Sequence, residues 1–183
     1  MEALKIIKKR HLTPHFTIGE LIKTKHKTTD GNMPGFAALE NLQRICEQWL
    51  EPLRERYNER YVLPQPDRGQ VPVRNTLAPM ADRNLSPVRP EPIIINSGFR
   101  SEEVNKLVGG QKTSNHLTGC AVDIRCLGPE QVYRYGCILI DIADETRQDF
   151  DELLCEHNAK GDYWLHLAVR PTNNRRHISF LRG

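Results

Sequence analysis

The stretch Ser114-Asn-His116-Leu-Thr-Gly119-Cys-Ala121-Val-Asp123 joins an imidazole to a carboxylate through a turn that contains a glycine. Glycine lets the chain fold back tightly there, because it adopts left-handed backbone conformations at little cost. His116 on the loop and Asp123 on the strand that follows can then converge on one point. Zinc accepts both ligand types, and a catalytic zinc site has three protein ligands and an open position for water.

The third ligand is predicted in the segment Trp164-Leu-His-Leu-Ala168. Side chains alternate between the two faces of a strand, so His166 lies on the face opposite Leu165 and Leu167. A single histidine in an apolar strand is more often a hydrogen-bonded core residue. The combination of His166 with the preceding motif is what predicts a zinc site with two histidines and one aspartate.

The residues before the motif predict helices. Thr17 and Glu20 have the spacing of a capping box, which begins a short helix. Apolar residues then recur every three or four positions over residues 36–56, as in an amphipathic helix with one buried stripe. Pro52 is expected to kink this helix or to end it locally.

The second half of the chain predicts mostly strands. Strands are expected at residues 92–96, 121–126, 150–155 and 163–169, with an edge strand at 177–181 and helices at 101–108 and 129–143. Helices first and strands afterwards indicate an α+β fold, in which N-terminal helices pack on a small antiparallel sheet.

One segment has neither pattern. Residues 63–92 contain seven of the twelve prolines, and we interpret them as a long surface loop inserted in a single domain of residues 1–183. An alternative is an extended arm over a neighbouring subunit or over the active cleft, since long structureless loops in compact domains are often functional.

Composition limits the cellular context. No apolar stretch is long enough for a signal peptide or a membrane span, so we expect a product that is cytoplasmic as synthesised and has no membrane partner. Five cysteines without CxxC spacing indicate reduced thiols in the core. Residues 1–28 hold seven Lys and Arg against two Glu, which indicates either a solvated terminus or affinity for an anionic partner.

These motifs resemble the zinc D-Ala-D-Ala carboxypeptidase family, which includes phage L-alanyl-D-glutamate endolysins. The similarity rests on three motifs, which are Ser97-Gly-Phe-Arg100-Ser101, Ser114-x-His-x-x-Gly-x-Ala-x-Asp123 and Trp164-Leu-His166. The residues upstream of these motifs are in addition similar to the phage-type branch of the family. The resemblance implies a hedgehog/D-Ala-D-Ala peptidase-like fold and a zinc-dependent peptidase that cuts peptidoglycan peptides, as an endopeptidase or a carboxypeptidase. Such a zinc site activates a water molecule near neutral pH.

The resemblance also implies roles for other residues. Arg100 matches the substrate-side arginine of the family, and Ser114 is expected to hydrogen-bond the peptide. One branch carries its general base three residues before the last histidine, where this chain has Tyr163. Glu156 and Asp162 remain as candidate bases, and we favour Glu156 because phage-type relatives carry Glu there. His157 and His177 are further candidates as hydrogen-bond donors.

Two other functions compete with this one. A phage particle component could keep zinc for stability without turnover, with Cys120 closing the site as a fourth ligand. Nucleic-acid binding through the basic N-terminus and the 63–92 segment is the weaker alternative. If the chain is a phage lysin, the missing signal peptide implies release to the cell wall through a holin pore.

Overall fold

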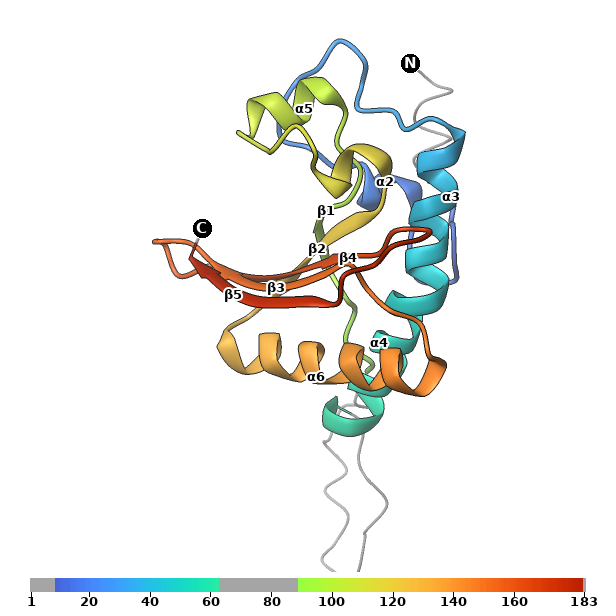
Figure 1. The fold of residues 1–183 in the computed structure, drawn as a ribbon, viewed down its shortest axis with the longest axis vertical. Helices are drawn as coiled ribbons and strands as arrows, with labels where there is room; N and C mark the ends of the chain where they lie inside the picture. Colours follow the sequence, from blue (N-terminus) through green and yellow to red (C-terminus); the bar gives the residue numbers. More distant parts are fainter. Residues whose placement is uncertain (1–8, 63–88, 183) are drawn as a thin grey trace, which may run out of the picture.

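The computed structural model describes residues 9–62 and 89–182, which form helices and one sheet (Figure 1). The short helix α2 covers Ile18–Leu21. The Thr17 side chain accepts from the Glu20 amide and the Glu20 side chain accepts from the Thr17 amide, so the predicted capping box is confirmed. Ile18 and Leu21 are buried, and α2 thereby fixes the N-terminal segment to the core.

The predicted helix over residues 36–56 is confirmed and runs further. It consists of α3 (Phe36–Ile45), a π-helical turn (Cys46–Leu50), α4 (Glu51–Tyr57) and a second π-helical turn (Asn58–Val62). Pro52 occupies the first turn of α4. The helix continues through it, because the widened turn before Pro52 accommodates the ring and the missing N–H.

The remaining elements follow the predicted order. They are β1 (Ile95–Ser97), α5 (Glu102–Leu107), a 3-10 helix (Asn115–Thr118), β2 (Ala121–Cys126), α6 (Pro129–Thr146), β3 (Glu152–His157), β4 (Tyr163–Ala168) and β5 (His177–Arg182). Of the predicted loop over 63–92, residues 63–88 lie outside the described part of the chain, and residues 89–92 have no regular structure.

The sheet has the strand order β1-β2-β4-β3-β5 and is mixed. The prediction of an antiparallel sheet is wrong at one edge, where β5 runs parallel to β3. Both edges of β4 are already occupied by β2 and β3. The chain that leaves β4 therefore passes the start of β3, and β5 then pairs with the free edge of β3. Because β5 runs opposite to β4, it runs in the same direction as β3.

The two faces of the sheet have different surroundings. Helix α6 runs along one face, and the segments that carry α5 and the 3-10 helix lie on the other (Figure 1). The α6 side contains the apolar core, to which the sheet contributes Val122, Ile124, Leu153, Leu165 and Leu167. The opposite face is thus left for polar side chains, and Asp123 and His166 lie there.

Among residues 9–62 and 89–182, no helix has the length and apolar character needed to cross a membrane. The five cysteines are all free thiols, as predicted. Cys46, Cys120 and Cys126 are buried and Cys155 packs against the core, but Cys137 is exposed, so the prediction of core thiols is wrong for Cys137.

Candidate metal centre

The turn between His116 and Asp123 of the central motif packs against α3. Gly119 has φ +69°, and a Cβ atom at this position would lie 2.3 Å from the carbonyl oxygen of Ala38. Only glycine satisfies both conditions. The turn closes where the Cys120 amide donates to the carbonyl of Asn115. This geometry carries the chain from the 3-10 helix, which holds His116, directly into β2.

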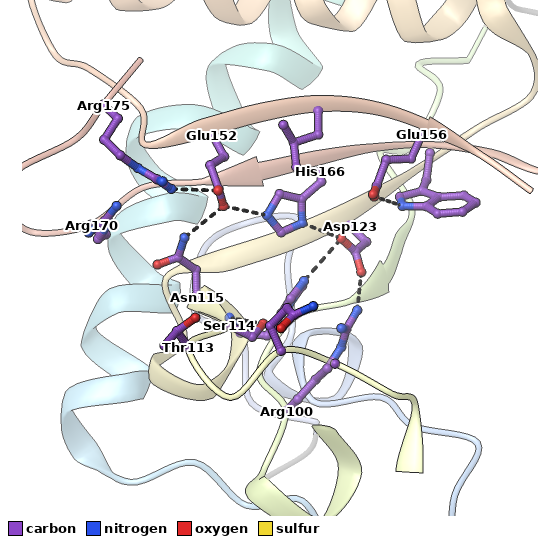
Figure 2. A pocket seen from close by; sticks show the side chains of 15 residues that line it. Arg100, Thr113, Ser114, Asn115, Asp123, Glu152, Glu156, His166, Arg170 and Arg175 are labelled. Atoms are coloured by element: carbon purple, nitrogen blue, oxygen red, sulfur yellow. Dashed lines mark hydrogen bonds and ion pairs between the residues drawn. The ribbon is translucent and has the colours of Figure 1, made fainter. Parts of the chain in front are cut away.

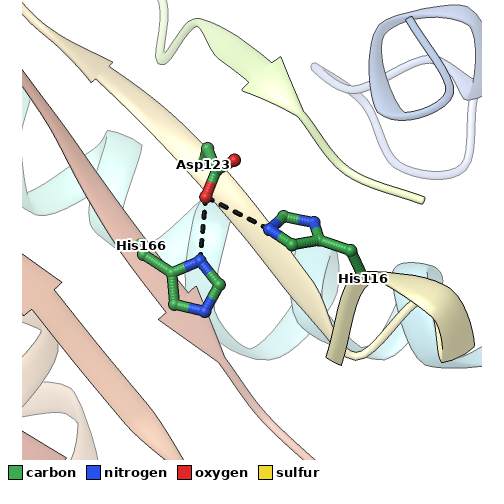
Figure 3. Close-up of side chains that lie close together, drawn as sticks. All are labelled: His116, Asp123 and His166. Carbon is green, nitrogen blue, oxygen red and sulfur yellow. Dashed lines mark hydrogen bonds and ion pairs between the residues drawn. The ribbon is translucent and has the colours of Figure 1, made fainter. Parts of the chain in front are cut away.

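Three side chains from three elements meet on the open face of the sheet. His116, Asp123 and His166 each offer one ligand atom, and these atoms lie within 4.8 Å of one another (Figure 3). Asp123 Oδ1 is 3.2 Å from His116 Nε2 and 2.8 Å from His166 Nδ1. Asp123 and His166 pair directly in the β2–β4 register, so strand pairing alone sets their approach. The predicted convergence of the three residues is therefore present.

The cluster is electrostatically coupled. Burial opposes ionisation of Asp123, but the charges and hydrogen bonds of His116 and His166 outweigh it and hold its pKa well below the usual range. Burial also opposes a charge on His166, yet hydrogen bonds with Asp123 and Glu152 raise its pKa to about 9. A metal ion would replace this proton as the positive partner of the carboxylate.

The surroundings of the cluster fit a metal site. His116 Nδ1 lies 2.6 Å from the carbonyl oxygen of Gly98, which leaves Nε2 facing Asp123. His166 Nε2 lies 3.7 Å from Glu152 Oε2, which leaves Nδ1 facing Asp123. Metal-binding histidines commonly have such a partner on the other ring nitrogen. Two nitrogens and one carboxylate oxygen suit zinc with an open fourth position.

The cluster opens into a pocket of about 640 Å³ whose lining is mostly polar (Figure 2). Arg100, Ser114 and Glu156 all line it, so the structure brings these three predicted residues to the cluster. The Arg100 guanidinium donates to Asp123 Oδ2, and its Nε donates to the Ser97 hydroxyl at 2.8 Å. The Ser114 hydroxyl accepts from the His116 amide at 3.3 Å.

Glu156 has the environment of a proton acceptor. It lies on β3 directly opposite Trp164, whose indole N–H donates to its carboxylate. Burial raises the pKa of Glu156 above its ordinary value. A carboxyl group with a raised pKa, in a pocket beside a metal cluster, can both accept and return a proton near neutral pH.

Other predicted candidates lie elsewhere. The carboxylate of Asp162 accepts from the Asn158 amide in the β3–β4 turn and lines a different hollow, so the structure does not bring it to the cluster. The His157 ring packs beside Tyr163, outside this pocket. His177 is an exposed residue of β5. Cys120 is buried and is not part of the cluster.

A network at one end of the pocket was missed by the sequence analysis. Asp151 is fully buried and accepts hydrogen bonds from Asn115, Arg170 and Arg175. Hydrogen bonds with His166 and Arg175 lower the pKa of the adjacent Glu152 to about 2, against the effect of burial. Alternation along β3 could have found Glu152, because it shares a face with Glu156. The arginines carry no comparable signal.

Two comparisons with known proteins bear on this site. The family model described as Peptidase M15 matches residues 78–136, a segment that contains Arg100, Ser114, His116 and Asp123 but neither His166 nor Glu156. The search of curated proteins found no match. The family match, together with the cluster, supports a metallopeptidase.

Proposed function

We propose that this chain is a zinc-dependent peptidase that hydrolyses peptide bonds in the stem peptides or cross-links of bacterial peptidoglycan. The observation that carries the proposal is the buried cluster of His116, Asp123 and His166, open to a polar pocket that also contains Glu156. The match to the Peptidase M15 family over the first half of this site supports the same activity. We also propose that the α+β fold is of the D-Ala-D-Ala peptidase type.

In the proposed mechanism, His116 Nε2, Asp123 and His166 Nδ1 hold the metal. Bound zinc supplies a Lewis acid that polarises a carbonyl and lowers the pKa of water. Glu156 takes the proton of the attacking water and returns it to the leaving amine. Its raised pKa suits both steps, because the group must be a base first and an acid later.

Two residues are assigned to the substrate. Arg100 donates to Asp123 Oδ2, the oxygen that does not face the two histidines, and it also lines the pocket. Its remaining N–H groups can therefore face a substrate oxygen. Ser114 is the N-cap of the 3-10 helix and lines the pocket, so it can hydrogen-bond the peptide. Both contacts would orient the scissile bond over the metal cluster.

The test is zinc content and peptidoglycan cleavage, measured on wild type and on His116→Ala. Elemental analysis should give one zinc per wild-type chain and a strong loss in the variant. Mass spectrometry of purified peptidoglycan should detect released peptides with wild type alone, and their masses would identify the bond. If the chain binds zinc but releases no fragments from several wall types, a non-catalytic zinc module is favoured. If the chain binds no zinc, the proposal is refuted.

A further inference from the structure

A second hollow adjoins the metal pocket and has a net positive charge. It has a volume of about 620 Å³ and is lined by three basic side chains, Lys23, Lys25 and Arg125. Trp164 lines both this hollow and the metal pocket, so the two are neighbours across one side chain. Lys23 and Lys25 belong to the basic N-terminal segment, whose excess of charge has no role in the proposed mechanism.

Strand pairing fixes where this hollow lies relative to the metal cluster. In the β2–β4 register, Asp123 pairs with His166 and the next residue on the same face, Arg125, pairs with Trp164. Two residues along a strand span about 7 Å. Arg125 therefore lies one row beyond the metal ligands on the open face of the sheet, and its side chain is exposed.

The three cations are unpaired with any carboxylate in the part of the chain that the structure describes. Within residues 9–62 and 89–182, neither Lys23, Lys25 nor Arg125 forms an ion pair. The arginines of the metal pocket differ, because each donates to a carboxylate.

The hollow also has one acidic residue. Among its described lining residues, Asp162 is the single carboxylate, and it accepts from the Asn158 amide at 2.9 Å. Three cations against one anion leave a net positive hollow that faces solvent. Unpaired cations beside a polar pocket are suited to an anionic group of a ligand.

We infer that this hollow is a subsite for a carboxylate group of an acidic peptide whose scissile bond lies at the metal cluster. The inference rests on the proposed function and adds a specificity determinant to it. One extended residue spans about 3.3–3.6 Å, so the recognised carboxylate belongs to a residue one or two positions from the scissile bond. Arg125 is the central contact, because it shares a sheet face with Asp123.

The experiment measures binding without turnover. The probe is a synthetic stem peptide of L-alanine, γ-linked D-glutamate, L-lysine and D-alanine, prepared with the glutamate α-carboxylate either free or amidated. Calorimetry on the zinc-loaded Glu156→Gln chain gives both affinities, and mass spectrometry checks that the peptides stay intact. A charge-assisted contact predicts about tenfold tighter binding of the free acid, a preference that added salt reduces.

Substitutions then locate the subsite. In the same background, Arg125→Ala should abolish the preference, and Arg125→Glu should reverse it in favour of the amide. Lys106→Ala removes an exposed lysine on α5 outside both pockets and should keep the preference. Equal binding of the two peptides by the parent chain, or a preference that persists in Arg125→Ala, would overturn the inference.

These outcomes separate the subsite from the proposed function. Peptidoglycan cleavage by the wild type, with no carboxylate preference in the Glu156→Gln chain, would retain the peptidase function and remove the subsite. A chain that prefers the acid through Arg125 but releases no fragments from any wall retains the subsite and loses the peptidase function.

Discussion

Glu156 and Asp162 are the two carboxylates that sequence reasoning offered as general base, and their surroundings differ. Glu156 is partly buried on β3 within the metal pocket, where it accepts from the indole of Trp164. Asp162 is exposed in the turn that precedes β4. Burial raises the pKa of Glu156, whereas the Asp162 carboxylate is free to contact water. The environment therefore favours Glu156.

We predict that Glu156→Gln lowers kcat by about a hundredfold or more, because general-base catalysis commonly contributes 10²–10⁴. Glutamine keeps the shape and can still accept from Trp164, so zinc content should not change. Release of peptides from peptidoglycan by mass spectrometry, with zinc measured in parallel, checks this. Glu145→Gln, at an exposed ion pair with Arg56 outside both pockets, is the matched control and should leave kcat within about twofold. Asp162→Asn compares the other candidate base, and a larger loss there than in Glu156→Gln would exchange the two assignments.

At the scale of elements, the turn from the 3-10 helix into β2 depends on Gly119. Its φ of +69° is unfavourable for any residue with a Cβ, and that atom would meet the backbone of α3 at 2.3 Å. The packing of α3 against this turn thus holds His116 and Asp123 in relation to each other. The long helix that begins with α3 thus has a direct part in shaping the candidate metal centre.

Gly119→Ala should reduce the free energy of unfolding by about 2–4 kcal/mol, from the left-handed backbone and the forced shift of α3. It should also weaken zinc binding, because the turn can relax only by displacing a ligand. Urea unfolding and zinc titration measure the two effects. Gly136→Ala on α6 is the control: its Cβ meets nothing within 4 Å, and removing a helical glycine should stabilise by about 0.5–1 kcal/mol. A tolerated Gly119→Ala would contradict the role of the turn.

At the scale of the whole molecule, Asp151 connects segments that are distant in sequence. Its buried carboxylate accepts from Asn115 on the 3-10 helix and from Arg170 and Arg175 in the β4–β5 connection. Burial opposes its ionisation, but these hydrogen bonds hold the pKa of Asp151 well below its usual range. The network thereby links the β4–β5 connection to the 3-10 helix that bears His116.

Asp151→Asn should lower the free energy of unfolding at pH 7 by about 2 kcal/mol, since it removes the charge from hydrogen bonds that arginines donate. The folded-state pKa is depressed, so the wild-type contribution is complete above the unfolded pKa of about 3.9 and declines as the pH falls below it. Urea unfolding at pH 7 and pH 3 should therefore show a smaller difference at pH 3.

Asp144→Asn provides the comparison for Asp151. Asp144 pairs with Arg176 at the surface, where its side chain is 62% exposed, so the substitution should cost less than about 0.5 kcal/mol. A difference between wild type and Asp151→Asn that grows toward pH 3 would contradict the predicted linkage.

The sequence by itself determined the order of the elements and the three residues of the candidate metal cluster, because both are encoded locally. Periods of two and of three to four residues specify which segments become strands and helices, and a capping box specifies where α2 begins. The convergence of this cluster could be predicted because His116 and Asp123 flank one glycine turn and His166 interrupts an apolar strand. Alternation along β3 also places Glu152 on the same face as Glu156.

Only the tertiary structure decided the features that join distant segments. The parallel pairing of β5 depends on which strand edges are free once β4 is enclosed, and no local pattern encodes that. The arginines that reach Asp151 come from an irregular connection, so no period predicts their direction. The structure also places Glu156 in the pocket of the cluster and Asp162 outside it, which depends on burial and on the partner strand of β3, since two carboxylates of the same charge differ only in what surrounds them.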